Sequence, residues 1–493
     1  MRAAAEAVRR HRDLWRLTAC AAAAGLAVTA GAVAVAGPWD SGQRTAERAL
    51  AGEVSPERDE AHIEPLPDDL PAAPSAGPVL PAAGSSAADG AAAAADREGG
   101  AEGPNSADGP SGQRAFAEVL DPLLRDPALA GGISASVVDL TTGRQLYGAA
   151  PDTVRPPASS VKLVTGAAAL QALGPDHRLA TRVVWDGAHD RVVLVGGGDT
   201  TLTAGDLRKL AEETADALAD RGIATVGVGY DADRYSGPAL HPIGVNSNIA
   251  PLTSLMVNAG RLDDSTHGPA PRAADPAARA AADFVGHLGD AGIEVKGASA
   301  APRDAPPGAE RLAGHRSAPV SALVERFLTT SDNDLAESLA RHTAVATGHA
   351  PDFAGIEAAA AEQLADLGLA VDDVRIVDGS GLDRGARVTA ALLTGLLATA
   401  ADPGRPELRP VLTGLPVAGF SGTLSGRYAE GGAGVVRAKT GTLTGVNTLS
   451  GTLVDAEGRL LGFSFMANGT QAPRAAEAAL DRAVTALTVC GCR

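Results

Sequence analysis

A serine and a lysine one helical turn apart, at the predicted start of a helix, most constrain the fold of this chain. Pro156 and Pro157 require an extended approach, and good helix formers follow over residues 161–170. Ser159 is therefore expected at or just inside the helix N-terminus, with Lys162 on the same face. A lysine amine that is desolvated enough to be partly neutral can take the proton of a serine hydroxyl. The pair predicts a nucleophilic serine with a lysine base, beside helix N–H groups that can stabilise an oxyanion.

A serine three residues before a lysine is also common as surface decoration. The composition weighs against that interpretation, because the chain has only four lysines and uses arginine elsewhere. A retained lysine favours a role that requires a titratable amine. The four are Lys162, Lys209, Lys296 and Lys439.

Two further motifs follow along the chain. Ser331-Asp332-Asn333 precedes a helical pattern, and Lys439-Thr440-Gly441 lies in a strand-like run over residues 435–443. Ser-x-x-Lys, Ser-Asp-Asn and Lys-Thr-Gly together are the motif set of class A β-lactamases and penicillin-binding proteins. All three occur here in that order, and two of the four lysines lie in them. We therefore predict acyl transfer through Ser159.

The N-terminal region predicts a membrane segment and a spacer. Residues 1–16 carry five arginines and two acids, and residues 17–37 are uncharged over a length that can cross a bilayer. We expect 1–16 in the cytoplasm and 17–37 as a transmembrane anchor, or as a signal peptide if the chain is cleaved after the small-x-small stretch 34–36. Residues 38–112 hold fourteen acids and four arginines among Ala, Pro, Gly and Ser, which predicts a disordered linker.

The remaining chain predicts a catalytic domain with an insertion. We place the catalytic domain at 113–180 plus 312–493, and one or two inserted accessory domains at 181–311, where strands and a helix alternate. The fold class is α/β (α+β), an antiparallel sheet flanked by helices. The expected catalytic strands lie within 132–147, 435–443, 446–454 and 459–467, and the expected helices are 317–331, 337–346, 389–401 and 475–487.

Other kinds of site find no support in the sequence. The ten histidines are scattered without a His-Glu-x-x-His motif, and neither a Gly-x-Ser-x-Gly elbow nor a phosphate-binding glycine loop is present. We expect no metal, no cofactor and no nucleic-acid partner. Cys490 and Cys492 either form a disulfide or stay free, and neither has a predicted catalytic role.

Between about residue 115 and residue 487 the chain resembles the D-alanyl-D-alanine carboxypeptidase/endopeptidase family of low-molecular-mass, class C penicillin-binding proteins. Besides the three motifs, the resemblance depends on Gly197-Gly198-Asp199, Met256-Val257-Asn258, Asp378-Gly379-Ser380-Gly381-Leu382, Leu415-Pro416-Val417-Ala418-Gly419 and Gly422-Thr423-Leu424. Ser160, Thr200 and Ser421 depart from the family's usual residues. The resemblance implies a β-lactamase/transpeptidase-like fold. It also implies hydrolysis of peptidoglycan peptides that end in D-Ala-D-Ala, with β-lactams as covalent inhibitors.

The resemblance also implies roles for individual residues. Five side chains would be catalytic: Ser159 as nucleophile, Lys162 as proton acceptor, Ser331 as proton relay, Asn333 as the residue that positions Lys162, and Lys439 as a fixed positive charge. Three residues would bind substrate: Thr440, Gly441 and Thr442. The backbone N–H groups of Ser159 and Thr442 would form the oxyanion hole.

Three other functions stay open at this point. A β-lactamase or an esterase would use the same constellation, and a non-catalytic penicillin-binding-like module would use the fold for contacts alone. The long insert and the anchor favour a cell-wall enzyme. We expect it at the cell membrane with its catalytic domain outside, or secreted to the cell wall if the N-terminal segment is cleaved. The sequence leaves open whether it trims the terminal D-Ala, cuts peptide cross-links, or does both.

Overall fold

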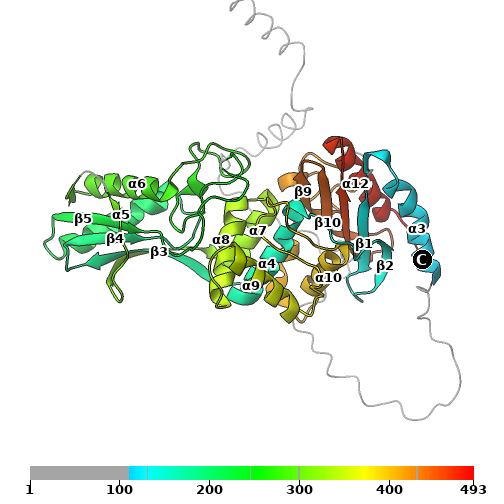
Figure 1. Cartoon of the computed structure of the whole chain (residues 1–493), viewed down its shortest axis with the longest axis horizontal. Helices are drawn as coiled ribbons and strands as arrows, with labels where there is room; N and C mark the ends of the chain where they lie inside the picture. The colour runs from blue at the N-terminus through cyan, green and yellow to red at the C-terminus, as the bar shows by residue number, and fades with distance from the viewer. Residues whose placement is uncertain (1–109, 130, 245, 298–299, 429–430, 493) are drawn as a thin grey trace, which may run out of the picture. The chain divides into compact units, whose positions relative to one another are not determined.

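A five-stranded antiparallel sheet joins the two ends of the described chain. The computed structural model describes residues 110–492 except 130, 245, 298–299 and 429–430. The strand order is β2-β1-β11-β10-β9, so the first strand pairs with the last (Figure 1). The strands are β1 (Ile133–Asp139), β2 (Gln145–Ala149), β9 (Arg437–Leu443), β10 (Val446–Val454) and β11 (Leu460–Asn468). Strand β9 lies at an edge, where it packs against the short helix η2 (Ala158–Val161).

Helices cover both faces of this sheet. On one face α3 (Pro110–Leu124) and α12 (Pro473–Thr488) share a core with Phe463 and Phe465 of β11. On the other face α10 (Ala390–Ala401) packs against β1 and β11. The helices that extend this second layer are α4 (Lys162–Leu173), α7 (Val320–Thr330), α8 (Asn333–Ala346) and α9 (Phe353–Asp366). Because both faces are covered, β11 is buried from Leu461 to Ala467 rather than on alternate residues.

Helix α4 is the centre of the helical layer. Its residues are buried from Lys162 to Leu170, and it contacts α7, α8, α9 and α10. Small residues allow this close packing: a Cβ on Gly166 would lie 3.0 Å from Val324 Cγ1. Because α4 is buried on all sides, its first residue, Lys162, is desolvated as well.

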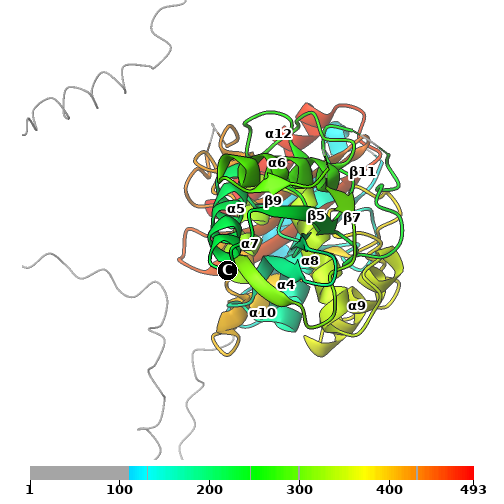
Figure 2. The same cartoon turned by 90° about the vertical axis from the view of Figure 1, so that its left-hand side faces the viewer.

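A second sheet is built from the chain between α4 and α7. Its order is β6-β5-β4-β3-β8, with β7 also pairing with β5. Strands β4 and β5 are parallel and joined through α5, whereas β3 and β8 are antiparallel. Helices α5 and α6 pack against each other and share a core with the sheet (Figure 2). The elements are β3 (Arg178–Asp186), β4 (Arg191–Val195), α5 (Ala204–Ala219), β5 (Thr225–Asp231), α6 (Pro276–Asp290), β6 (Glu294–Val295), β7 (Ala301–Pro302) and β8 (Glu310–Pro319).

The predicted mixed fold is confirmed, with small shifts at element ends. The second sheet runs from Arg178 to Pro319, and the domain boundaries at 181 and 311 stay a prediction. Helix α8 begins at Asn333, not at residue 337, because the Asp332 side chain accepts a hydrogen bond from Leu335 N (3.0 Å) and caps the helix. The remaining short elements are η1 (Pro127–Leu129), η3 (Asn258–Gly260), η4 (Pro406–Leu408), α11 (Pro410–Thr413) and η5 (Gly422–Leu424).

The two ends of the chain differ in how far the structure tests the sequence predictions. The predicted segments 1–16 and 17–37 lie outside the described residues, as does the linker up to residue 109; residues 110–112 begin α3. Within residues 110–492, where described, no helix has the length and apolar character needed to span a bilayer. At the other end, Cys490 and Cys492 are joined by a disulfide, which settles the alternative left open by the sequence.

Candidate active site

Ser159 and Lys162 meet where η2 leads into α4. Ala158 has a left-handed backbone (φ 48°), which is uncommon for a residue with a Cβ and typical of functional sites. The turn places Ser159 in the short helix and Lys162 at the start of α4, with Lys162 Nζ 3.1 Å from Ser159 Oγ. The predicted pair of hydroxyl and amine is therefore within hydrogen-bond distance.

Three acceptors surround the Lys162 amine. Besides Ser159 Oγ, Nζ donates to Asn333 Oδ1 (2.7 Å) and to the backbone carbonyl of Ser380 (2.7 Å). A neutral amine has two N–H bonds and one lone pair. With its N–H bonds directed at Asn333 and Ser380, the lone pair points at the Ser159 hydroxyl.

Burial also tunes this amine. Desolvation lowers the pKa of Lys162 to about 8, although four carboxylates oppose the shift. The four are those of Asp378, Glu337, Asp332 and Asp334. A pKa near 8 leaves about a tenth of the lysine neutral at pH 7, so a proton acceptor is present under ordinary conditions.

The second motif forms the junction between α7 and α8. Ser331 has a left-handed backbone (φ 59°) that ends α7, and Asn333 is the first residue of α8. The Asn333 side chain links two partners: its Oδ1 accepts from Lys162, and its Nδ2 donates to the carbonyl of Asn248 (2.9 Å). No hydrogen bond joins the Ser331 hydroxyl to another described residue, so its relay role stays a prediction.

The third motif lines the outer edge of the sheet on β9. Lys439 is fully buried and its Nζ donates to the Thr440 carbonyl (2.7 Å). Burial, with the charge of Lys162 adding to it, holds the pKa of Lys439 well below its usual value. The fixed positive charge expected there therefore depends on a counter-ion, and a substrate carboxylate would restore the ammonium form.

Gly441 allows β9 to lie beside the nucleophile. A Cβ at this position would lie 2.6 Å from the Pro157 carbonyl oxygen and 3.1 Å from Ser159 N, and would also clash with the Thr448 hydroxyl. Of its neighbours, the Thr440 hydroxyl donates to Thr423 Oγ1 (2.9 Å). The absent side chain is thus required for the close approach of strand and turn.

Several residues at the site were not predicted. The Ser380 carbonyl, the buried acids Glu337 and Asp378, and Glu477, which accepts from Thr442 Oγ1 (3.2 Å), were assigned no role from the sequence. In the sequence, the turn at 378–382 supports the family resemblance and indicates no role for its residues. A buried acid in α8 has the sequence pattern of a surface residue, and a backbone carbonyl leaves no sequence signal at all.

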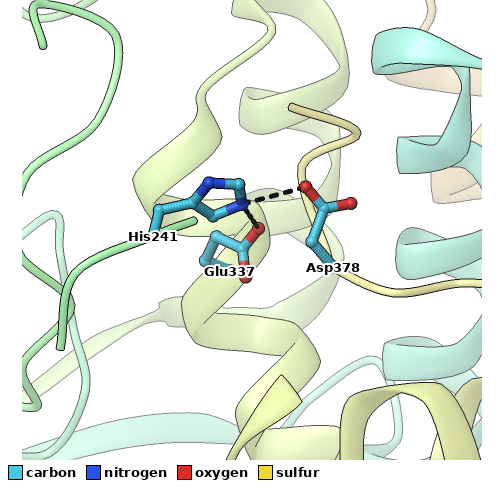
Figure 3. Close-up of side chains that lie close together, drawn as sticks. All are labelled: His241, Glu337 and Asp378. Atoms are coloured by element: carbon cyan, nitrogen blue, oxygen red, sulfur yellow. Dashed lines mark hydrogen bonds and ion pairs between the residues drawn. The ribbon is translucent and has the colours of Figure 1, made fainter. Parts of the chain in front are cut away.

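One cluster in the described chain has the composition of a metal site. Figure 3 shows His241, Glu337 and Asp378, whose ligand atoms lie within 4.8 Å of one another. Each oxygen that faces the imidazole is already occupied: Glu337 Oε1 accepts from the N–H groups of Gly379 (3.1 Å) and Ser380 (3.0 Å). Asp378 Oδ2 likewise accepts from His241 and from backbone. We therefore interpret the cluster as a hydrogen-bonded support, not as a metal site.

Comparisons with known proteins show the family of this chain. The family model described as "D-Ala-D-Ala carboxypeptidase 3 (S13) family" matches residues 116–272 and 263–487. A carboxypeptidase of Mycobacterium tuberculosis is 36% identical over an alignment of 394 residues, and the match covers 74% of this chain and 82% of that protein. A D-alanyl-D-alanine carboxypeptidase of an Actinomadura species is 33% identical over 452 residues, covering 72% and 81% of the two chains.

Solved structures share the fold. Penicillin binding protein 4 of Haemophilus influenzae has a TM-score of 0.63 and 22% identity, and the match covers 74% of this chain and 98% of that chain. At this identity the likeness supports the fold alone. It agrees with the mixed architecture of antiparallel sheet and helices.

Proposed function

The chain belongs to the D-Ala-D-Ala carboxypeptidase 3 (S13) family, and on this premise we propose that its serine D-Ala-D-Ala carboxypeptidase activity proceeds through an acyl-enzyme on Ser159. One observation carries the assignment of the nucleophile. Lys162 Nζ lies 3.1 Å from Ser159 Oγ, and burial lowers the pKa of this amine to about 8. A serine hydroxyl needs such a base to attack a peptide carbonyl near neutral pH.

The acylation step follows from this pair. Ser159 Oγ attacks the carbonyl of the D-Ala-D-Ala bond while its proton passes to the neutral Lys162 amine. The developing oxyanion is held by the backbone N–H groups of Ser159 and Thr442, each worth roughly 3 kcal/mol in comparable sites. Ser331 donates its hydroxyl proton to the leaving D-Ala amine and takes a proton back from the Lys162 ammonium, so the lysine is neutral again. Water then hydrolyses the ester and regenerates the serine.

The substrate C-terminus is assigned to the β9 edge. Its carboxylate is recognised by Lys439 and by the hydroxyls of Thr440 and Thr442, while Gly441 leaves room for the peptide backbone. Lys439 is buried beside the edge, and an arriving anion would pair with its ammonium form. A β-lactam, which presents a carboxylate beside a reactive amide, would acylate Ser159 in the same way.

We expect the chain over residues 113–493 to release D-alanine from a synthetic peptide that ends in D-Ala-D-Ala. The released amino acid is measured with a stereospecific detection enzyme, and a peptide that ends in L-Ala-L-Ala is the control. Failure to release D-alanine would contradict the carboxypeptidase assignment. A cross-linked peptide dimer in the same assay decides whether the chain is also an endopeptidase.

We also propose that the chain is held at the cell membrane by residues 17–37 with its catalytic part outside the cell. The support is sequence-based: an uncharged run follows five arginines. The full chain is expected in the membrane fraction, where detergent but not salt extracts it, and a chain without residues 1–37 should stay soluble. If expression of the full chain instead gives a soluble product that lacks the mass of the N-terminal segment, the segment is cleaved and the enzyme is secreted.

A further inference from the structure

His241 reaches the catalytic domain from the segment between β5 and η3. Its side chain is fully buried, and Nε2 lies 3.1 Å from Asp378 Oδ2 and 3.7 Å from Glu337 Oε1 (Figure 3). The ring also stacks edge-on against Phe353 of α9, at 5.5 Å between centroids. The segment between β5 and η3 thus places a buried polar side chain against the loop after α9.

The proton of His241 is on the nitrogen that faces Asp378. Ile243 N–H donates to Nδ1 (3.3 Å), which requires the neutral ring to carry its proton on Nε2. Burial lowers the pKa of His241, but the hydrogen bond with Asp378 and the nearby carboxylate charges outweigh burial and raise the pKa overall. A second proton would go to Nδ1 and leave Nε2–H in place, so the ring is a donor to Asp378 in both charge states.

Asp378 in turn controls the carbonyl that binds the catalytic amine. Asp378 Oδ1 accepts from Gly381 N (2.9 Å), and the Ser380 carbonyl, in the same peptide unit, accepts from Lys162 Nζ (2.7 Å). Because a peptide unit is planar and trans, the direction of its N–H sets the direction of its C=O. The carboxylate therefore orients, from one side, the group that holds Lys162 from the other.

We infer that His241 is a positioning residue for acylation: by donating to Asp378 it fixes the Ser380–Gly381 peptide unit and thereby Lys162. The inference rests on the proposed function, since it assigns Lys162 as the base. It makes the inserted segment part of the catalytic apparatus rather than a separate module.

A second contact from the same segment supports this. The Asn248 carbonyl accepts from Asn333 Nδ2 (2.9 Å), so it orients the amide whose oxygen binds Lys162. Asp334, next to Asn333, anchors that stretch: its Oδ1 accepts from Ala250 N (2.8 Å), and its Oδ2 pairs with buried Arg272 (2.9 Å). Two of the three partners of Lys162 are thus oriented by the segment between β5 and α6.

The test uses three variants of the full chain. H241L removes the donor and keeps an apolar body, whereas H241Q keeps an N–H at similar reach. H315L is the matched control, because His315 also faces carboxylates, those of Asp199 (3.7 Å) and Asp206 (3.6 Å), but within the second-sheet region. Labelling time courses at several concentrations of a fluorescent penicillin separate the initial dissociation constant from the acylation rate constant, and thermal unfolding is followed in parallel.

H241L is expected to acylate about 10- to 100-fold more slowly, since small misplacements of a catalytic group cost this much, with the initial dissociation constant changed by no more than about 2-fold. The acylation rate constant of H241Q should lie within about 3-fold of the wild-type value. That of H315L should equal the wild-type value. If H241L does not fold, H241N, which is too short to reach Asp378, takes its place with the same expected result.

The outcomes distinguish a failure of the positioning role of His241 from a failure of the proposed function. Wild-type acylation by H241L, or equal slowing in H241L and H241Q, would overturn the positioning role while leaving the proposed function intact. A wild-type chain that forms no penicillin adduct would overturn the proposed function, and the positioning role with it.

Discussion

Replacing Ser159 by alanine is expected to abolish the covalent adduct with a fluorescent penicillin and to lower D-alanine release by about 10⁴-fold or more. The hydroxyl oxygen is the atom that forms the acyl bond, and among the described residues it is the hydroxyl that is hydrogen-bonded to the Lys162 amine. Intact-mass measurement of the chain over residues 113–493 reports the adduct directly.

Ser160→Ala is the matched control for this experiment. Ser160 is the neighbouring serine, but it is buried and its hydroxyl pairs with Thr448 Oγ1 (2.8 Å) away from the lysine. The Ser160→Ala variant should still form the penicillin adduct, and its free energy of unfolding should fall somewhat because the hydrogen bond is lost. An adduct that persists in the Ser159 variant would overturn the nucleophile assignment.

The lifetime of the wild-type adduct checks the peptidase against the alternatives that the sequence alone left open. An adduct that persists for many minutes supports a penicillin-binding peptidase, because deacylation of a bulky penicilloyl ester is slow without a dedicated base. Rapid turnover with release of hydrolysed penicillin indicates a β-lactamase. Cleavage of simple esters without D-alanine release indicates an esterase, and the absence of any adduct favours a non-catalytic module.

Replacing Lys162 by methionine is expected to lower the acylation rate constant by about 10²- to 10⁴-fold, the usual contribution of a general base. Methionine has a similar length and suits the buried position, but it cannot accept a proton. Lys209→Met on α5 is the control, since that side chain is 74% exposed and remote from the motifs. A loss of less than about 10-fold in the Lys162 variant would contradict its role.

The pH dependence of acylation gives a second readout for this residue. Because burial lowers the pKa of Lys162 to about 8, and only the neutral amine accepts a proton, the wild-type rate should rise about tenfold between pH 7 and pH 9 and then level off. The charged groups that face this amine are Asp378, Glu337, Asp332 and Asp334, which raise its pKa against the larger effect of burial. The rise should disappear in the methionine variant. A flat wild-type profile would indicate a different base.

The two elements that carry the nucleophile and the base show how far local sequence reasoning reaches. Paired prolines and a run of helix formers predicted that Ser159 and Lys162 share a helix start, and the structure places them in η2 and at the first residue of α4. Strand-like runs and a hairpin turn likewise predicted β9, β10 and β11 to within a few residues. Such features depend on neighbours along the chain, so the amino-acid sequence determines them.

The contacts that adjust Lys162 have a different origin. The Ser380 carbonyl, the Asn248 carbonyl and the His241 imidazole all lie far from Lys162 in the sequence, and two of them act through backbone atoms that every residue possesses. Glu337 of α8 and Asp378 of the loop after α9 are both buried, and their charges oppose the lowering of the Lys162 pKa that burial of the lysine causes. The sequence by itself determined the motifs, the strands and helices, and the reaction class. Only the tertiary structure decided which groups orient and desolvate the lysine, because hydrogen-bond direction and burial depend on distances across the fold and not on spacing along the chain.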